Sequence, residues 1–206
     1  MGWLRRPAKV DFPLHESTYV VLDTETTGFH KTNDRIVSIG LVRVHQGRIV
    51  LKTAVEWYVR LSAELGNSPE IHGITRENFE GALSEEQSLK RFNLLTKDAI
   101  MVAHYAQFDR DMLQELAKRA GGNVENDQWL DTMDLQVGLE PELYRNAELL
   151  KLDTLLSHFQ IEAVSRHTAL GDAYSTALLL QRQLALFKQR GITQFSAVPK
   201  PRLGLF

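Results

Sequence analysis

Residues 17–28 read Ser-Thr-Tyr-Val-Val-Leu-Asp-Thr-Glu-Thr-Thr-Gly, and their β-branched and aromatic residues predict a strand over 17–25. Asp23 and Glu25 are two positions apart, so on an extended chain both carboxylates leave the same face. Two carboxylates this close repel each other unless a cation lies between them. Magnesium or manganese suits such oxygen ligands. The alternative is that both side chains are solvated at the strand end, where Thr26, Thr27 and Gly28 form a turn.

The rest of the chain predicts an α/β fold, with a mixed central sheet of about five strands flanked by helices. Four further strands are predicted over residues 35–44, 48–59, 99–103 and 129–135. A turn at Gln46-Gly47 joins two of them into a hairpin. Helices are predicted from Ser84 to Leu95 and over residues 108–120, 139–150, 152–159 and 168–190. We expect a core domain over 17–191, an N-terminal extension over 1–16 and a C-terminal tail over 192–206.

Three more titratable residues follow predicted strands or open predicted helices. Asp109 comes just after the strand over 99–103, where α/β proteins place their sites. His167 precedes the last long helix and Asp172 lies in its first turns. A histidine beside a metal site can take a proton from water. The alternative interpretation is that His167 is a surface residue and that each aspartate complements a helix dipole.

Taken together, these residues resemble the three exonuclease motifs of the DEDDh family of 3′→5′ exonucleases. The motifs are Asp23-Thr-Glu25-Thr-Thr-Gly, Phe108-Asp109, and His167 with Asp172 five residues later. The similarity extends over residues 18–188 and includes Ile71-His-Gly-Ile-Thr75 and Asp131-Thr-Met-Asp-Leu135. The family contains the proofreading epsilon subunit of the bacterial replicative polymerase.

The resemblance implies an RNase H-like exonuclease fold and two divalent ions, Mg²⁺ or Mn²⁺. Asp23 would bridge both ions, Glu25 and Asp172 would bind the ion on the side of the nucleophile, and Asp109 would hold the other. His167 would be the general base. Two such ions stabilise the attacking and leaving oxygens of a phosphodiester.

The resemblance also implies a set of substrate contacts. The backbone around Thr26 and the side chain of His72 would hold the terminal 3′-hydroxyl, and Ile71 and Phe108 would flank the last base. Ile71 and Phe108 could instead be core residues. One position departs from the family, because Tyr105 stands where the second motif commonly has asparagine. We expect this change to alter the shape of the substrate site and to leave the metal ligands intact.

Composition narrows the function classes. The chain has 206 residues, 43% hydrophobic and 24% charged, and no cysteine, which excludes thiol catalysis and thiolate zinc sites. Nothing in it predicts a membrane span or a signal peptide, so a cytoplasmic protein is expected. Residues 1–10 carry +3 and residues 181–206 carry +5, which leaves −10 for residues 11–180. An acidic body argues against extensive duplex binding but suits an enzyme that holds a 3′ end through its metals.

The leading hypothesis is a metal-dependent 3′→5′ exonuclease that releases nucleoside 5′-monophosphates from single-stranded or frayed DNA, in proofreading or repair. Alternatives are an exoribonuclease that trims RNA, as RNase T-like relatives do, and a non-catalytic adaptor associated with a polymerase or clamp. The C-terminal Arg202-Leu-Gly-Leu-Phe206 is similar to a bacterial sliding-clamp-binding peptide, with arginine in place of the usual glutamine. Leu203, Leu205 and Phe206 would be its anchors, unless they fold back onto their own domain.

Overall fold

A computed structural model describes residues 11–61 and 79–199 of the chain. Its strands are β1 (Thr18–Thr26), β2 (Ile36–His45), β3 (Arg48–Tyr58), β4 (Ile100–Ala103) and β5 (Trp129–Asp131). They form one sheet in the order β3-β2-β1-β4-β5. The first three strands are antiparallel, and β4 and β5 run parallel to β1. The predicted mixed sheet is therefore confirmed, with β1 at its centre.

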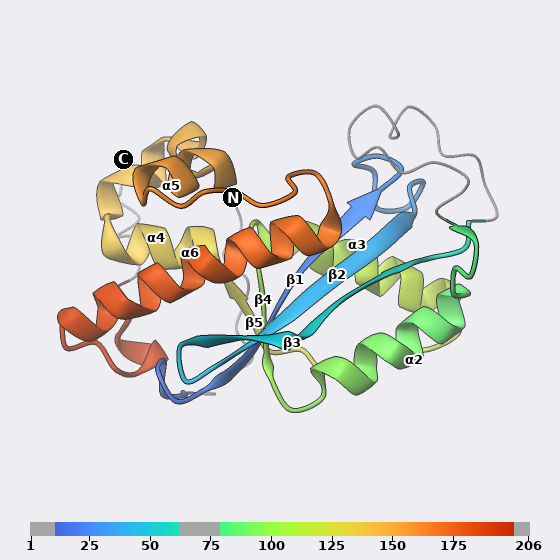
Figure 1. Ribbon diagram of the computed structural model, residues 1–206, viewed down its shortest axis with the longest axis horizontal. Helices are drawn as coiled ribbons and strands as arrows, with labels where there is room; N and C mark the ends of the chain where they lie inside the picture. The colour runs from blue at the N-terminus through green and yellow to red at the C-terminus, as the bar shows by residue number, and fades with distance from the viewer. Residues whose placement is uncertain (1–10, 62–78, 200–206) are drawn as a thin grey trace, which may run out of the picture.

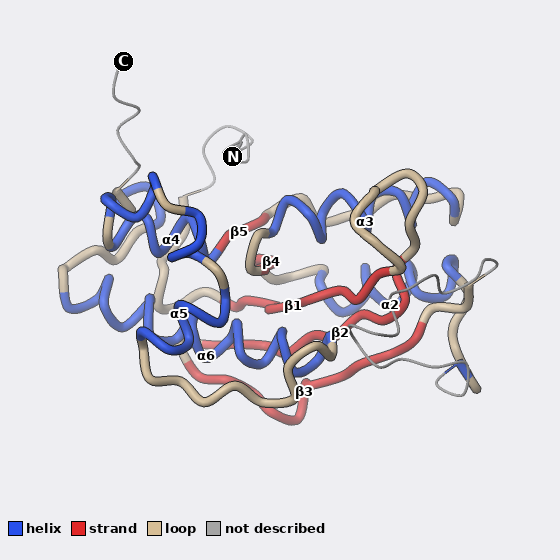
Figure 2. Tube along the Cα trace, turned by 90° about the horizontal axis from the view of Figure 1, so that it is seen from above, coloured by secondary structure: helices blue, strands red, loops and turns tan. Residues whose placement is uncertain are grey.

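Helices cover both faces of this sheet (Figures 1 and 2). They are α2 (Glu85–Thr96), α3 (Ala106–Arg119), α4 (Thr132–Leu139), α5 (Leu152–His158) and α6 (Ala169–Gln189). Val20 and Leu22 of β1 face a core that α2 and α3 complete. Tyr19 and Val21, which point the other way, face a core completed by α4 and α6. Because both faces of β1 are covered, its residues before Asp23 are almost all buried.

Local chemistry explains several element boundaries. Gln46 and Gly47 both have positive φ, at 49° and 70°, as a two-residue hairpin of type I′ requires. Ser84 caps α2, since its side chain accepts from the Gln87 backbone N–H and the Gln87 side chain accepts from the Ser84 backbone N–H. Thr168 caps α6 by accepting from the Gly171 N–H at 3.1 Å. The predicted hairpin and both helix starts are confirmed.

Two expectations about residues 129–150 were wrong. The predicted fifth strand ends at Asp131 instead of continuing to residue 135. Asp131 accepts from the Met133 N–H at 2.9 Å and so starts α4 at that point. The predicted helix over 139–150 is instead two turns of 3-10 helix, η2 (Pro141–Arg145) and η3 (Ala147–Leu150). Pro141 cannot donate a backbone bond, and a bond from the Glu148 N–H to the Asn146 side chain starts a new turn.

The described parts of the expected terminal extensions pack on the domain. The Leu14 N–H donates to the Thr193 carbonyl at 2.8 Å, and the Phe12 and Phe195 rings stack with centroids 4.6 Å apart. A short 3-10 turn, η4 (Phe195–Ala197), follows. Leu14 and Val198 are buried in the core beside α6. Across the described residues we find no helix whose length and apolarity would let it cross a bilayer.

Candidate active site

Three carboxylates meet where β1 ends and α6 begins. Asp23 and Glu25 leave the same face of β1, and Asp172 lies in the first turn of α6. One carboxylate oxygen of each residue lies within 4.8 Å of the other two. The structure thus brings together three of the predicted metal ligands, two from the N-terminal part of the sequence and one from the C-terminal part.

A glycine on the neighbouring strand allows this approach. Gly40 of β2 pairs directly with Asp23 of β1. A Cβ atom built on Gly40 would lie 2.2 Å from the backbone carbon of Ala169, the first residue of α6. A side chain at this position would therefore push away the start of α6, and Asp172 with it. The close packing of helix on strand places the third carboxylate beside the other two.

The electrostatics of the cluster favour a bound cation. Burial raises the pKa of Asp23 well above its usual range, and the nearby charges of Asp109 and Glu25 raise it further. Burial also raises the pKa of Glu25, with a contribution from Glu56 on β3. Carboxylates that are costly to ionise together are stabilised by a divalent ion with oxygen ligands. The donor set therefore fits Mg²⁺ or Mn²⁺.

Asp109 lies beside this group of three, in the first turn of α3. Its side chain is buried and accepts from the Thr24 hydroxyl at 2.8 Å. Burial raises the pKa of Asp109 to about 7, and the hydrogen bond from Thr24 opposes that change. The charge of Asp109 acts on Asp23. Asp109 is not one of the three residues whose carboxylate oxygens meet within 4.8 Å, and it acts on them through its charge on Asp23.

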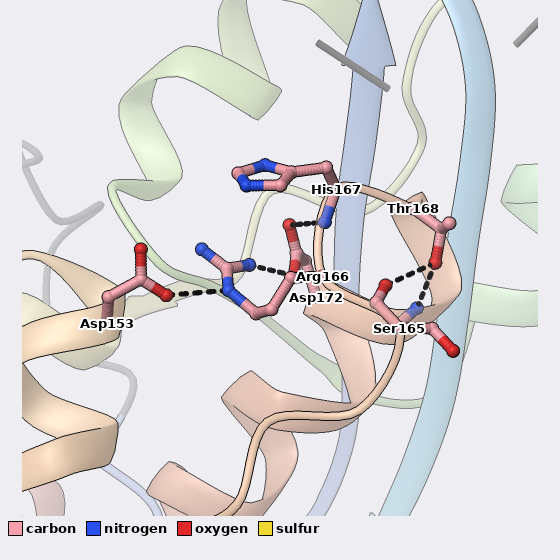
Figure 3. A network of polar contacts seen from close by, with 7 residues as sticks. Asp153, Ser165, Arg166, His167, Thr168 and Asp172 are labelled. Carbon is pink, nitrogen blue, oxygen red and sulfur yellow. Dashed lines mark hydrogen bonds and ion pairs between the residues drawn. The ribbon is translucent and has the colours of Figure 1, made fainter. Parts of the chain in front are cut away.

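The loop before α6 carries His167 and a residue to which sequence reasoning gave no role. The His167 backbone N–H contacts Asp172 Oδ2 at 3.3 Å, while its imidazole makes none of the contacts drawn in Figure 3. Arg166 Nη1 contacts Asp172 Oδ1, and Arg166 Nε contacts Asp153 Oδ1 at 2.7 Å. The sequence contained a sign of this contact, because Arg166 directly precedes His167 in the motif that ends at Asp172.

The start of α3 depends on a left-handed residue at the position that departs from the family. Tyr105 has φ 64° and ψ 50°, a region in which asparagine is more favourable than tyrosine. The Asp131 carboxylate accepts from the Tyr105 N–H at 3.1 Å and from the Ala106 N–H at 2.9 Å. These bonds hold the backbone at the start of α3, the helix that carries Asp109.

Of the four predicted substrate-binding residues, Thr26 and Phe108 are among the described residues. The Thr26 hydroxyl donates to the Gly28 carbonyl at 2.7 Å, which shapes the turn after β1. Phe108 is half-buried, and its ring centroid lies 6.1 Å from that of Phe29, whose side chain is 80% exposed. The sequence analysis did not single out Phe29, an aromatic residue in the polar loop after the first motif. Ile71 and His72 lie outside the described residues, as do Leu203, Leu205 and Phe206.

Comparisons with known proteins agree with this geometry. Residues 20–180 match a family model described as Exonuclease. A DNA polymerase III subunit epsilon-like protein of Rhodobacter capsulatus is 36% identical over 195 residues, which are 93% of this chain and 27% of that protein. A DNA polymerase III PolC-type of Caldanaerobacter subterraneus is 33% identical over 185 residues, 89% of this chain and 13% of that protein. The chain therefore spans about a quarter or less of the length of these curated relatives.

The fold comparison points the same way. Exonuclease I of E. coli, solved in complex with a dT13 oligonucleotide, superposes with a TM-score of 0.70 at 17% identity. The match covers 85% of this chain and 43% of that one. The RNase H-like exonuclease fold expected from the sequence is confirmed. With most of its length matched by the family model and its acidic residues gathered at one end of β1, the chain belongs to the exonuclease family.

Proposed function

We propose that this protein is a divalent-metal-dependent 3′→5′ exonuclease that removes nucleoside 5′-monophosphates from single-stranded or frayed DNA ends. The observation that carries the proposal is the meeting of Asp23, Glu25 and Asp172 within 4.8 Å. A water molecule adds to the terminal phosphodiester phosphorus while the bond to the 3′-oxygen breaks. The shortened strand keeps a 3′-hydroxyl and the product carries the phosphate.

Four carboxylates would hold the cations in this proposal. Asp23 would be shared between two ions, Glu25 and Asp172 would complete one position, and Asp109 would serve the other. When bound, the cations would offset negative charge at the scissile phosphate and make water more acidic. His167 would accept the proton of the attacking water, since its loop adjoins Asp172 and its imidazole extends from a left-handed backbone with φ 62°.

The substrate would be held mainly at its last nucleotides. Phe29 and Phe108 present adjacent aromatic rings, and stacking on aromatic side chains accepts any base. The turn around Thr26 lies between Glu25 and Phe29 in the sequence and would receive the terminal sugar. Ile71 and His72 remain predictions for the same contacts.

DNA is the favoured substrate because of the proteins that this chain resembles. Its relatives carry the name DNA polymerase III, and exonuclease I has been solved with single-stranded DNA. We infer a role in which polymerase errors or damaged ends are trimmed, beside or within a replicative polymerase. Binding to a sliding clamp through Leu203, Leu205 and Phe206 stays a prediction.

The test is degradation of matched single-stranded DNA and RNA oligonucleotides, labelled at the 5′ end, with Mg²⁺ or Mn²⁺. We expect a ladder of shortened DNA, slower cleavage of RNA, and loss of at least about a thousandfold of activity in Asp23→Asn. Asp98→Asn, at an exposed aspartate before β4, is the matched control and should retain full activity. Preferential cleavage of RNA would reassign the substrate, and undiminished activity of Asp23→Asn would overturn the metal mechanism.

A further inference from the structure

Arg166 joins the acidic cluster to the helix beside it. Its Nη1 contacts Asp172 Oδ1, and its Nε contacts Asp153 Oδ1 at 2.7 Å (Figure 3). The Arg166 side chain is only 22% exposed, whereas that of Asp153, on α5, is 70% exposed. One guanidinium therefore connects a mostly buried carboxylate of the cluster to an exposed carboxylate outside it.

The contact on Asp172 uses a group that the cation site also needs. Asp172 is one of the three residues whose carboxylate oxygens lie within 4.8 Å of one another. The positive charge of Arg166 also acts on Asp23 and Glu25, where it favours the ionised carboxylate. An arginine and a divalent ion on the same carboxylate would repel each other, because both are positive and close. Arg166 and a cation therefore compete for this group.

The guanidinium of Arg166 has several N–H donors, so it can release Asp172 to a cation without losing all of its partners. Nε and Nη1 bond to different carboxylates, so the Asp172 contact can be released while the Asp153 contact is kept. Arg166 lies in the loop between α5 and α6, next to His167, and that loop already has left-handed residues at Ser165 and His167. Asp153 supplies the second anchor that keeps the released side chain near the site.

We propose that Arg166 is an internal counter-ion of the cation site: it neutralises Asp172 before a divalent ion binds, and it yields Asp172 to that ion while Asp153 retains the guanidinium. This inference rests on the proposed cation site. It makes Arg166 a positioning residue that sets how tightly the metal is held, and it gives Asp153 an effect on metal binding that acts through Arg166.

The test measures the Kd for Mn²⁺ by calorimetry or by electron paramagnetic resonance on the full chain without nucleic acid. Arg166→Gln removes the competitor, so we expect it to bind Mn²⁺ about tenfold more tightly than the wild type. Asp153→Asn leaves Arg166 with Asp172 as its main partner, so we expect Mn²⁺ to bind about threefold more weakly. The two substitutions therefore shift the Kd in opposite directions.

The double variant Asp153→Asn/Arg166→Gln should bind Mn²⁺ like Arg166→Gln, because Asp153 has no arginine left to hold. Arg119→Gln is the matched control for the arginine: its Nε contacts Glu85 at 2.7 Å, and its side chain is also 22% exposed. Asp98→Asn controls for the loss of one negative charge. Neither control should change the Kd.

The outcomes separate this inference from the proposed function. An unchanged or weaker Kd in Arg166→Gln overturns it, as does an effect of Asp153→Asn that persists when Arg166 is absent. Circular dichroism shows whether Arg166→Gln folds. If it does not, the exposed variant Asp153→Asn still tests the inference. A Kd for Mn²⁺ equal to that of Asp98→Asn would then contradict it. A wild-type chain that binds no Mn²⁺ would instead refute the cation site itself.

Discussion

At the scale of single residues, His104 shows how burial changes the pKa of a side chain that feels the charges of Arg166 and Asp153. Its Nδ1 lies 2.8 Å from the Thr132 hydroxyl. Burial lowers the pKa of His104 to about 4, although a hydrogen bond with the Leu150 carbonyl opposes the change. The neutral ring thus links the end of β4 to the segments that lead to α5.

This burial predicts a dependence of stability on pH. Between pH 6.5 and pH 4 the unfolded histidine binds a proton that the folded one does not, so acidification through this window destabilises the fold. The loss is at most about 3 kcal/mol, the difference between the two pKa values in energy units. In His104→Gln this component is absent. Urea unfolding at several pH values measures the free energy of unfolding of both proteins. The same dependence of this free energy on pH in the wild type and in His104→Gln would contradict the prediction.

Phe29 carries the second residue-scale prediction. Phe29→Ala should raise KM for a single-stranded oligonucleotide about tenfold with little change in kcat, because a stacking surface is lost and the carboxylates are untouched. Leu94→Ala on α2 is the control, since Leu94 is a large apolar side chain that is 74% exposed. Steady-state kinetics on one oligonucleotide series measures both. Equal KM values for the two variants would rule out the aromatic pair as a binding surface.

At the scale of elements, the site depends on how closely α6 approaches the sheet. Ala169 and Ala173 are completely buried in α6, a helix that packs on β1 and β2. Small residues let the backbone of the helix come near the strands, and Gly40 is the extreme case. The distance between Asp172 and the β1 carboxylates is thus set by packing between elements.

Gly40→Ala is the corresponding prediction. The added Cβ would meet the Ala169 backbone, which cannot rotate away, so we expect a loss of about 3 kcal/mol in the free energy of unfolding. Mn²⁺ affinity should fall as well, because Asp172 moves with α6. Gly122→Ala is the control, since its Cβ would meet only the end of the Leu89 side chain at 2.9 Å. Urea unfolding and Mn²⁺ titration of both variants measure the two effects. If Gly40→Ala changes neither the free energy of unfolding nor the Mn²⁺ affinity, α6 does not pack as closely on Gly40 as we infer.

At the scale of the whole molecule, cation binding should stabilise the fold. A ligand present at a hundred times its Kd adds about 2.7 kcal/mol, which for a domain of this size raises Tm by about 5–10 °C. We expect Mn²⁺ to produce this rise, EDTA to reverse it, and Asp23→Asn to abolish it. Asp23→Asn without metal should be slightly more stable than the wild type, because burial and repulsion disfavour the ionised carboxylate. Thermal melts with and without EDTA decide both points.

The charge distribution predicts weak sensitivity to salt. Residues 11–180 carry −10, so the domain has little positive charge with which to bind many phosphates. If only two or three phosphates are held, log(kcat/KM) for single-stranded DNA should fall with log[KCl] with a slope of about −2 or shallower. A much steeper slope, measured at constant free Mg²⁺, would reveal a basic surface that this distribution does not suggest.

The sequence by itself determined the local features and the candidate residues. Alternation on β1 put Asp23 and Glu25 on one face, Ser84 and Thr168 marked helix starts, and Gln46-Gly47 formed the hairpin. Each of these depends on neighbours in the chain, so a local pattern is sufficient. The strand over 129–135 failed because Asp131 bonds both to the start of α3 and to α4, a choice no local pattern records.

Only the tertiary structure decided how close these residues come. Asp172 reaches Asp23 because α6 packs against Gly40, and α5 brings Asp153 to the guanidinium of Arg166. Phe29 and Phe108 become neighbours in the same way. Residue types and spacing select ligands for a cation, but the distances between ligands from different elements are fixed by the packing of helices on the sheet.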